Sequence, residues 1–502
     1  MKSLLTDNCQ KKKIFYSLLT DEDISDDDYQ HAIDVWNTFD IQNMGEYHDL
    51  YLKSDILLLA DVFENFREGC LEYYGLDPTH YITTPGLSWD AMLKMTSTNL
   101  ELITDIDMLL FVEKGMRGGI SYIANRHARA NNKYMKFYNP EDDTTYIIYL
   151  DANNLYGWAM IQPLPYGGFQ WVEPKYYAEK KEGIGHIYEV DLEYTEHLHD
   201  SHHDYPLAPE KMAVTDDMLS PYCKMIKNKF GISNGIVQKL IPTLYNKEKY
   251  VLHEINLELY LNLGLCLKRI NRVLQFNEKP WLKPYIDFNT EKRKNAKNSF
   301  EKAFFKLMNN SVFEKTMENL RKRCNVYLEN DNKHFLRQTA KPTYVSSKIF
   351  SENLVVVNMK KIRLMLDKPS YVGMCILDLT KSLMYVFHYN YIKPKYGEKA
   401  KLLFTDTDSL CYIIETDNIY EDLYRDRGLL TIVITKNLPS SFLMKIKKVI
   451  GKFKDEAAGE PIIEFVGLKS KMYSYETAKK TIRRQKVLKR MLSRETFNMK
   501  IT

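Results

Sequence analysis

Two runs of branched and aromatic residues, joined by a short acidic tetrapeptide, constrain the fold of this chain more than any other feature. Residues 401–405 and 410–414 have the composition of β-strands, and between them stand Asp406, Thr407, Asp408 and Ser409. A hairpin with this spacing places both aspartates near its tip and on one face. Two neighbouring carboxylates can bind a hard divalent cation, although an Asp-x-Asp turn by itself is more often a solvated loop.

A third run with the composition of a strand ends at another aspartate. Residues 144–150 are rich in branched and aromatic side chains, and Asp151 follows them directly. Functional groups often gather at strand ends, so Asp151 is a candidate third carboxylate. The simpler alternative is that Asp151 caps a following helix.

Between these strands, the sequence predicts a helical stretch over about residues 289–323. Polar residues recur there at every fourth position, at Lys294, Asn298, Lys302, Lys306 and Asn310. The apolar residues expected to fall largely on the buried side are Phe300, Phe304, Leu307 and Met308. Lysines that face bound metal ions can neutralise a triphosphate, whereas the stripe alone is typical of any amphipathic helix.

Composition sets only broad limits on the class of protein. A length of 502 residues allows three to four domains. No uninterrupted apolar run is long enough to cross a membrane, and the seven cysteines form no Cys-x-x-Cys pair, so we expect an intracellular protein without a membrane partner. Basic clusters at 292–294, 321–323 and 469–494 suit a phosphate backbone, or they are solvated helix faces.

Two helices are predicted near the N-terminus. Ser25, followed by three aspartates, has the pattern of a helix N-cap, and the helix should continue to about Phe39. A second helix is expected over about residues 55–70. Its apolar residues, including Leu58 and Leu59, recur at helical spacing and predict a core face.

Taken in order along the chain, the three elements resemble motifs A, B and C of the family B DNA polymerases. Residues 151–156 are similar to D-x-x-S-L-Y, residues 306–313 to K-x-x-x-N-S-x-Y, and residues 406–409 match D-T-D-S. The resemblance covers nearly the whole chain. It is strongest to the protein-primed branch found in phages, linear plasmids, some viruses and transposons of the Polinton/Maverick type.

Three shorter segments resemble further motifs of that branch. Residues 471–473 are similar to its K-x-Y motif, which contacts the primer end and the incoming nucleotide, and residues 116–119 resemble its template-binding Y-x-G-G loop. Tyr51 and Asp55 resemble the third exonuclease motif, Y-x-x-x-D. The first two matches are short, and taken alone a surface lysine with a core tyrosine, or a simple Gly-Gly turn, explains them better.

The resemblance implies an α/β (α+β) right-hand polymerase with palm and fingers. It also implies a truncated RNase H-like exonuclease remnant without activity at the N-terminus and a reduced thumb at the other end. The expected domains are the exonuclease-like part at 1–100, the palm at 101–288 and 324–475, the fingers at 289–323 and a basic thumb stub at 476–502.

The implied activity is DNA-directed DNA synthesis from deoxynucleoside triphosphates with two Mg²⁺ ions held by Asp151, Asp406 and Asp408. The partners are a DNA template and a primer, or a terminal protein as primer. Nucleotide binding is assigned to Lys306, Asn310, Tyr156, Lys294 and Lys302, where Tyr156 either excludes a 2′-hydroxyl or is plain core. Primer and template binding is assigned to Lys471, Tyr473, Arg117, Gly118, Gly119, Thr407 and Ser409.

Several positions depart from the family pattern. Asn154 replaces a serine, Gly157 a proline and Met116 the loop tyrosine, and Phe313-Glu314 stands where Tyr-Gly is typical. Glu314 would repel a triphosphate. An alternative is therefore a catalytically degenerate DNA-binding remnant of a mobile element. A reverse transcriptase is disfavoured because the acidic turn is not Tyr-x-Asp-Asp.

Overall fold

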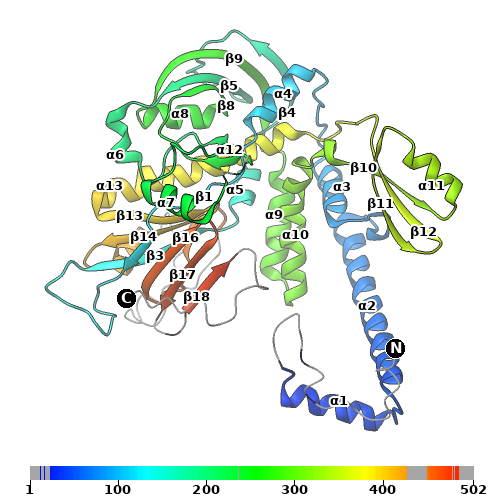
Figure 1. Ribbon diagram of the computed structural model, residues 1–502. Coiled ribbons are helices and arrows are strands. Elements are labelled where there is room, and N and C mark those ends of the chain that lie inside the picture. Colours follow the sequence, from blue (N-terminus) through cyan, green and yellow to red (C-terminus); the bar gives the residue numbers. More distant parts are fainter. Residues whose placement is uncertain are drawn as a thin grey trace. The chain divides into compact units, whose positions relative to one another are not determined.

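A computed structural model describes Lys12, Tyr16 and residues 23–233, 235, 237–426, 449–477, 479 and 481–485 (Figure 1). The chain divides into two compact units, Met1–Leu87 and Ser88–Thr502. Within the described ranges, no helix is long and apolar enough to cross a bilayer. The basic tail after residue 485, which the sequence assigns to a thumb stub, lies outside the described residues.

The first unit confirms the two predicted N-terminal helices but not their burial. Helix α1 (Asp26–Thr38) begins where the Ser25 hydroxyl accepts a hydrogen bond of 3.0 Å from the Asp28 amide. Helix α2 (Met44–Tyr74) is longer than expected. Leu58 and Leu59 of α2 are 63% and 68% exposed, so the predicted core face is wrong. A 3₁₀ turn, η3 (Pro78–His80), and α3 (Thr84–Thr96) follow.

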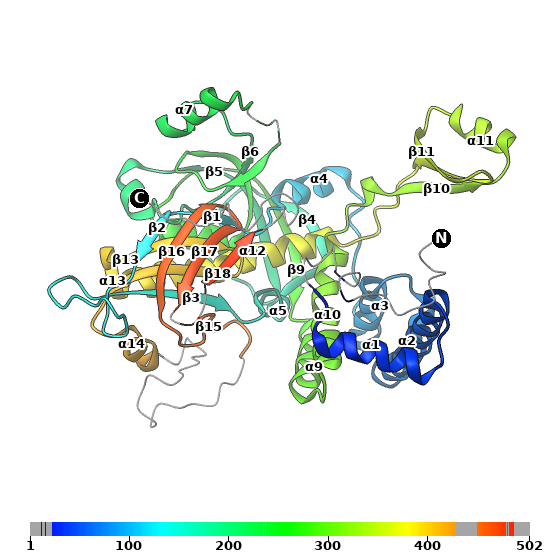
Figure 2. The same ribbon diagram turned by 60° about the horizontal axis from the view of Figure 1, so that its bottom comes forward.

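An antiparallel sheet forms the centre of the second unit (Figure 2). Seven of its strands lie in the order β1 (Ser121–Ile123), β13 (Ala400–Asp406), β14 (Ser409–Glu415), β3 (Thr145–Ala152), β16 (Ile462–Lys469), β17 (Met472–Thr477) and β18 (Thr481–Gln485). In addition, β15 (Phe453–Asp455) pairs with β3, and β2 (His127–Arg129) pairs with β16. The three strands predicted from sequence are therefore confirmed as β3, β13 and β14.

The sheet is buried on both faces, which explains the nearly continuous apolar runs of its strands. Ile148 and Leu150 of β3 belong to one core cluster, whereas the alternate residues Ile147 and Tyr149 belong to another. Helix α12 (Ser370–Val386) is buried along most of its length, and the short α5 (Leu155–Met160) packs against it. The central strands are thus held rigidly at the point where β3 and β13 end.

Further elements surround this sheet. A four-stranded sheet has the order β4 (Leu164–Val172), β9 (Cys266–Lys279), β5 (Ile184–Glu193) and β8 (Lys247–His253). A two-stranded sheet pairs β6 (Glu210–Met212) with β7 (Lys239–Ile241). The remaining helical segments are α4 (Ile106–Gly115), η4 (Glu196–Leu198), α6 (His199–His202), α7 (Pro221–Phe230), α8 (Glu254–Asn262), η6 (Phe387–Ile392), α13 (Lys393–Tyr396), η7 (Gly397–Lys399) and α14 (Ile419–Arg425).

The helical stretch predicted over 289–323 consists of two helices that pack side by side, α9 (Lys283–Asn295) and α10 (Ser299–Thr316) (Figure 1). Asn298 lies between them and caps α10, because its side chain accepts a hydrogen bond of 2.8 Å from the Glu301 amide.

The predicted buried side of this stretch is partly wrong. Phe300 and Leu307 are 49% and 44% exposed, whereas Met308 is buried as expected. The face of α10 that packs on α9 is marked by polar contacts: Tyr285 donates to the Met308 carbonyl at 3.2 Å, and Asn289 donates to Asn309 at 2.9 Å. Apolar spacing alone did not identify that face.

The segment over 325–357 contains strands, turns and one helix. After the turn η5 (Leu320–Lys322), the strands β10 (Cys324–Glu329), β12 (Leu354–Lys360) and β11 (Tyr344–Ser351) form a three-stranded sheet in that order. Helix α11 (Asn332–Thr339) connects β10 to β11.

Tyrosine hydroxyls satisfy the backbone of a buried segment, 204–209, that lies outside any strand. The carbonyls of Asp204, Tyr205, Pro206 and Pro209 accept hydrogen bonds from Tyr122, Tyr389, Tyr385 and Tyr250, in that order. A buried carbonyl without a partner is costly, so these hydroxyls make an irregular path through the core possible. This arrangement accounts for part of the chain's high content of 36 tyrosines.

We predict that Tyr385→Phe lowers the free energy of unfolding by about 1–2 kcal/mol, because the Pro206 carbonyl, now 2.9 Å from the hydroxyl, loses its donor. Tyr222→Phe is the matched control, since Tyr222 is 64% exposed. Urea unfolding of both variants measures the difference. Equal stability of the two variants would contradict the structural role of the hydroxyl.

Candidate functional site

Antiparallel pairing brings the end of β3 to the turn between β13 and β14. Asp151 of β3 lies opposite Ser409 of β14, and the Ala152 amide donates a hydrogen bond of 2.7 Å to the Asp408 carbonyl. Asp406 is the last residue of β13. The three aspartates predicted as a set therefore come from neighbouring strand ends, although they are far apart in sequence.

The turn that carries two of these aspartates is held by the loop at 116–120. Thr407 adopts a left-handed backbone conformation (φ 65°), and its amide donates a hydrogen bond of 2.8 Å to the Ile120 carbonyl. A Cβ atom at Gly119 would lie only 2.4 Å from Thr407 Cγ2, so this position requires glycine. At Gly118 a Cβ atom would meet open space. The loop thus contacts the acidic turn on one side and is open on the other.

Negative charge is concentrated at Asp408. The pKa of Asp408 is raised to about 6, first by burial, then by the neighbouring carboxylate of Asp151 and to a smaller extent by that of Asp406. Burial also raises the pKa of Asp151, against the opposing effect of Lys454. The site therefore holds carboxylates in a setting that favours binding of a cation.

Two lysines that come from the last part of the sheet neutralise part of this charge. Lys454 Nζ lies 3.0 Å from Asp151 Oδ1 and 2.5 Å from Glu456 Oε2. Lys471 Nζ lies 2.6 Å from Asp406 Oδ1. Sequence reasoning missed Lys454 and Glu456, because nothing in the local pattern around β15 indicates that this strand pairs with β3. Lys471, predicted to contact a primer, lies beside an acidic residue of the site.

The residues present fit a hard divalent cation, even though the carboxylates are not gathered into one cage. Among the described residues, no three His, Cys, Asp or Glu side chains form a group that could hold a metal ion together. However, Asp406 Oδ1 is buried without a well-aligned hydrogen bond, and Asp408 is crowded by other carboxylates. Carboxylate oxygens suit Mg²⁺. Asp151 raises the pKa of Asp408 more than Asp406 does, so Asp151 and Asp408 interact most strongly. Asp406 would have to break its ion pair with Lys471 before it could bind the same cation.

Helix α10 directs one of the predicted lysines towards these carboxylates. Lys306 is exposed on α10, and its charge lowers the pKa of Asp151. Lys302 is also exposed on α10 and Asn310 is half-buried, whereas Lys294 lies on α9 instead. Of the predicted nucleotide-binding lysines, Lys306 is the one whose electrostatic influence on the acidic site is evident.

Tyr156 and Phe313 form an aromatic pair beside the acidic site. Their ring centroids are 4.5 Å apart with the planes tilted by 31°. The pKa of Tyr156 is raised by burial and by the charge of Asp408, which places the ring close to that carboxylate. Glu314, the next residue of α10, is exposed.

Two departures from the family pattern depend on each other. Asn154 has a left-handed backbone conformation (φ 50°), and a Cβ atom at position 157 would lie 2.0 Å from its Nδ2. Gly157 therefore leaves the space that the Asn154 side chain occupies. Asn154 is the N-cap residue of α5 and Gly157 lies in its first turn, and this helix begins four residues after Asp151.

Other predicted contact residues are buried. Arg117 is 6% exposed: its guanidinium lies 3.7 Å from the centroid of the Tyr250 ring and donates a hydrogen bond of 2.6 Å to the Val251 carbonyl. Tyr473 is 7% exposed and stacks on Phe404, with ring centroids 4.3 Å apart. These contacts give both side chains an anchoring role, and a direct contact with DNA stays a prediction. Ser409 is likewise buried.

The residues that resemble an exonuclease motif lie in the first unit. Tyr51 and Asp55 are both on α2, one helical turn apart, and the Asp55 carboxylate raises the pKa of Tyr51 through a hydrogen bond.

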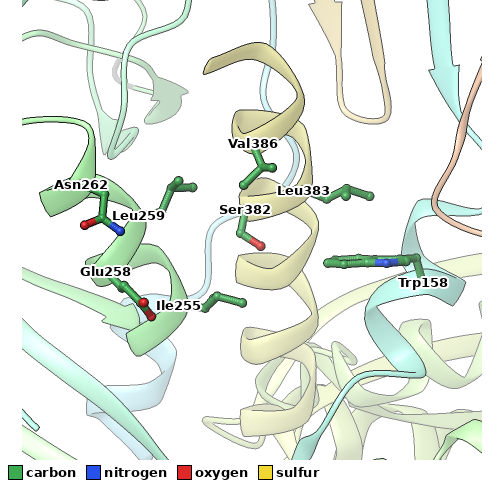
Figure 3. A pocket seen from close by; sticks show the side chains of 8 residues that line it. All are labelled: Trp158, Ile255, Glu258, Leu259, Asn262, Ser382, Leu383 and Val386. Carbon is green, nitrogen blue, oxygen red and sulfur yellow. The ribbon is translucent and has the colours of Figure 1, made fainter. Parts of the chain in front are cut away.

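A separate pocket of about 340 Å³ lies between α5, α8 and α12 (Figure 3). Its lining is mainly apolar, with Trp158, Leu259 and Leu383 among the side chains that face it. Its carboxylate, Glu258, is already paired with Lys180. None of the three aspartates lines this pocket, so it offers no continuation of the acidic site.

Residues 42–394 match the family described as DNA polymerase type B, organellar and viral, a range that includes Asp151 and Lys306 but ends before Asp406. No curated protein matches the chain.

Several solved structures are similar. Phi29 DNA polymerase in an orthorhombic crystal form is 16% identical with a TM-score of 0.47, covering 81% of this chain and 58% of that one. The same polymerase with primer-template DNA is 15% identical (TM-score 0.46, 80% and 60% covered). A family B DNA polymerase from the archaeon Pyrobaculum calidifontis is 10% identical (TM-score 0.29, 86% and 36% covered). The chain spans less than two thirds of the length of each.

We predict that Asp408→Asn stabilises the metal-free protein at pH 8. The pKa of Asp408 is raised from 3.8 to about 6 in the fold, so ionising this group costs the folded state up to about 3 kcal/mol at pH 8. Below about pH 3 the carboxyl is protonated in both states, and the difference should vanish. Thermal unfolding in EDTA across this pH range measures it.

Asp143→Asn is the control, because Asp143 is exposed. A gain in stability of Asp408→Asn that persists unchanged at pH 4, or that Asp143→Asn reproduces, would contradict the electrostatic account of this site.

Proposed function

Because this chain belongs to the type B DNA polymerases of organelles and viruses, we propose that it is a DNA-directed DNA polymerase whose site is formed by Asp151, Asp406 and Asp408. The observation that carries the proposal is the convergence of carboxylates at the ends of β3 and β13, where Asp151 and Asp406 both raise the pKa of Asp408. The substrates are deoxynucleoside triphosphates, a DNA template and a primer.

Mg²⁺, when bound, would activate the attacking hydroxyl and stabilise the leaving pyrophosphate. Asp151 and Asp408 would hold it, and Asp406 would join them after leaving Lys471. Oxygen donors at strand ends leave room for substrate phosphates on the open side of such a site. The reaction is attack of a primer 3′-hydroxyl, or of a terminal protein's hydroxyl, on the α-phosphate of the nucleotide.

The protein's own residues would bind and orient the substrates. Lys306 carries positive charge towards Asp151 from α10, so it is placed to offset charge on a triphosphate bound between them. Lys302 on the same helix, Lys294 and Asn310 would assist. The loop is open at Gly118, which suits the close approach of a template backbone. The side chain of Arg117 is buried and anchors the loop to the rest of the protein.

The domain assignment follows from this function. The central sheet and α12 would be the palm, and α9 with α10 would be the fingers. Residues 1–100 would be the exonuclease-like part and residues 476–502 a thumb stub, as the resemblance implies. Tyr51 and Asp55 would then belong to the exonuclease-like part.

A second candidate is a DNA-binding remnant that has lost catalysis. Two observations favour it: the lysines bound to Asp151 and Asp406, and the exposed Glu314 on the helix proposed to bind the triphosphate. Such a protein would still bind primer-template DNA with a strong dependence on salt.

Primer extension on a DNA template with Mg²⁺ separates the two candidates. We predict template-directed extension that falls more than about 100-fold in Asp151→Asn and in Asp408→Asn, because loss of a metal ligand removes several kcal/mol of transition-state stabilisation. Asp143→Asn should retain the wild-type rate. DNA binding without extension, in either Mg²⁺ or Mn²⁺, would favour the remnant.

We further predict that Tyr156 excludes ribonucleotides. Tyr156→Val, which removes the ring that packs on Phe313, should reduce discrimination between dATP and ATP by about 10- to 100-fold. Tyr156→Phe keeps the ring and should keep the discrimination. The ratio of kcat/KM for the two nucleotides is the measurement, and an unchanged ratio in Tyr156→Val would show that another residue excludes the 2′-hydroxyl.

A further inference from the structure

One ammonium group at the candidate site is shared by two carboxylates. Lys454 Nζ lies 3.0 Å from Asp151 Oδ1 and 2.5 Å from Glu456 Oε2. The side chains of Asp151, Lys454 and Glu456 are 21%, 28% and 31% exposed. All three are therefore partly accessible, and the lysine side chain has room to change its rotamer.

The backbone holds this trio in place. Lys454 lies directly opposite Asp151 in the pairing of β15 with β3, and the Glu456 amide donates a hydrogen bond of 2.8 Å to the Tyr149 carbonyl. Asp455, between the two, accepts hydrogen bonds from the Ala457 and Gly459 amides at 3.0 and 2.6 Å and so fixes the turn that follows. Lys454 and Glu456 consequently stay beside Asp151 whatever binds there.

The same carboxylate oxygen cannot serve the ammonium and a divalent cation equally well. Two positive charges within a few ångströms repel each other, and the repulsion is strong at a partly buried site. A cation that takes Asp151 must therefore displace the ammonium. Glu456 offers that ammonium a second anion without moving the backbone.

We propose that Lys454 is an internal counter-ion of Asp151 that a divalent cation displaces, and that Glu456 is the acceptor that retains the displaced ammonium. This inference rests on the proposed function, because it concerns the metal ion that nucleotidyl transfer requires. Lys454 and Glu456 are positioning residues in this scheme: they set how readily Asp151 is released to the cation.

The second ion pair of the site provides a contrast. Among the described residues, Lys471 pairs with Asp406 and with no second carboxylate. Release of Asp406 would leave that ammonium without a partner, whereas release of Asp151 would not. Asp151 is thus the aspartate whose ammonium partner a divalent cation can replace more easily.

Mn²⁺ binding to the full-length protein without DNA, followed by the electron paramagnetic resonance signal of the free ion, tests the proposal. Lys454→Met removes the competitor and should bind Mn²⁺ about three- to fivefold more tightly, the range expected for a partly exposed ion pair. Glu456→Gln leaves Asp151 as the only anion that Lys454 contacts. This variant should therefore bind Mn²⁺ about three- to fivefold more weakly than wild type. In the double variant Lys454→Met/Glu456→Gln, loss of Glu456 should have little further effect.

Lys452→Met is the matched control for loss of one positive charge. Lys452 lies two residues before Lys454, and no ion pair to Asp151 involves it within the described part of the chain. The affinity of the Lys452→Met variant for Mn²⁺ should stay within about twofold of the wild-type value. Thermal unfolding of each variant establishes that it is folded at the assay temperature. If Lys454→Met is not folded there, Lys454→Gln is used in its place.

Two results would overturn the proposal. If Lys454→Met binds Mn²⁺ more weakly, the lysine supports Asp151 instead of competing for it. If Glu456→Gln weakens binding equally with and without Lys454, Glu456 acts directly on the ion. Failure of the proposed function looks different: wild-type protein would show no primer extension, whatever the order of Mn²⁺ affinities among the variants.

Discussion

Repulsion between carboxylates is the constraint around which this structure is organised. Asp151, Asp406 and Asp408 lie at adjoining strand ends, and the carboxylates of Asp151 and Asp406 make ionisation of Asp408 harder, as the raised pKa of Asp408 shows. A fold can hold such a group together only if other interactions supply the stability. Here they come from antiparallel pairing along β3, β13 and β14 and from burial of both faces of the sheet.

The surroundings of the acidic site reduce this repulsion without removing it. Lys454 and Lys471 each approach one aspartate. Asp408 makes neither of these ion pairs, and Asp151 raises its pKa more than Asp406 does. The turn itself depends on a close contact, because Thr407 has a left-handed backbone and leaves no space for a side chain at Gly119. Charge, turn geometry and loop packing therefore act on the same few residues.

Much of the fold could be predicted from local pattern, because strands buried on both faces give continuous apolar runs and helix caps have distinctive residues. This holds for β3, β13, β14 and the cap at Ser25. The three aspartates could also be predicted, since Asp151 and Asp406 each stand at the end of a predicted strand and Asp408 stands in the turn that follows Asp406. The partners of these aspartates could not be found in this way: Lys454 reaches Asp151 only through the pairing of β15 with β3, which no spacing in the sequence encodes. The prediction of which side chains are buried was wrong at Phe300, Leu307 and Leu58 for a related reason. Periodicity does not say which element, if any, packs on a given face of a helix.

Whether these carboxylates bind the metal ions of nucleotidyl transfer is most directly tested by a crystal structure of the protein with primer-template DNA, a non-hydrolysable deoxynucleotide and Mn²⁺. The anomalous scattering of manganese locates the ions without ambiguity. We predict manganese bound to oxygen atoms of both Asp151 and Asp408, next to the nucleotide phosphates. Manganese bound elsewhere, with Asp151 and Asp408 both free of metal while the nucleotide is in place, would contradict it.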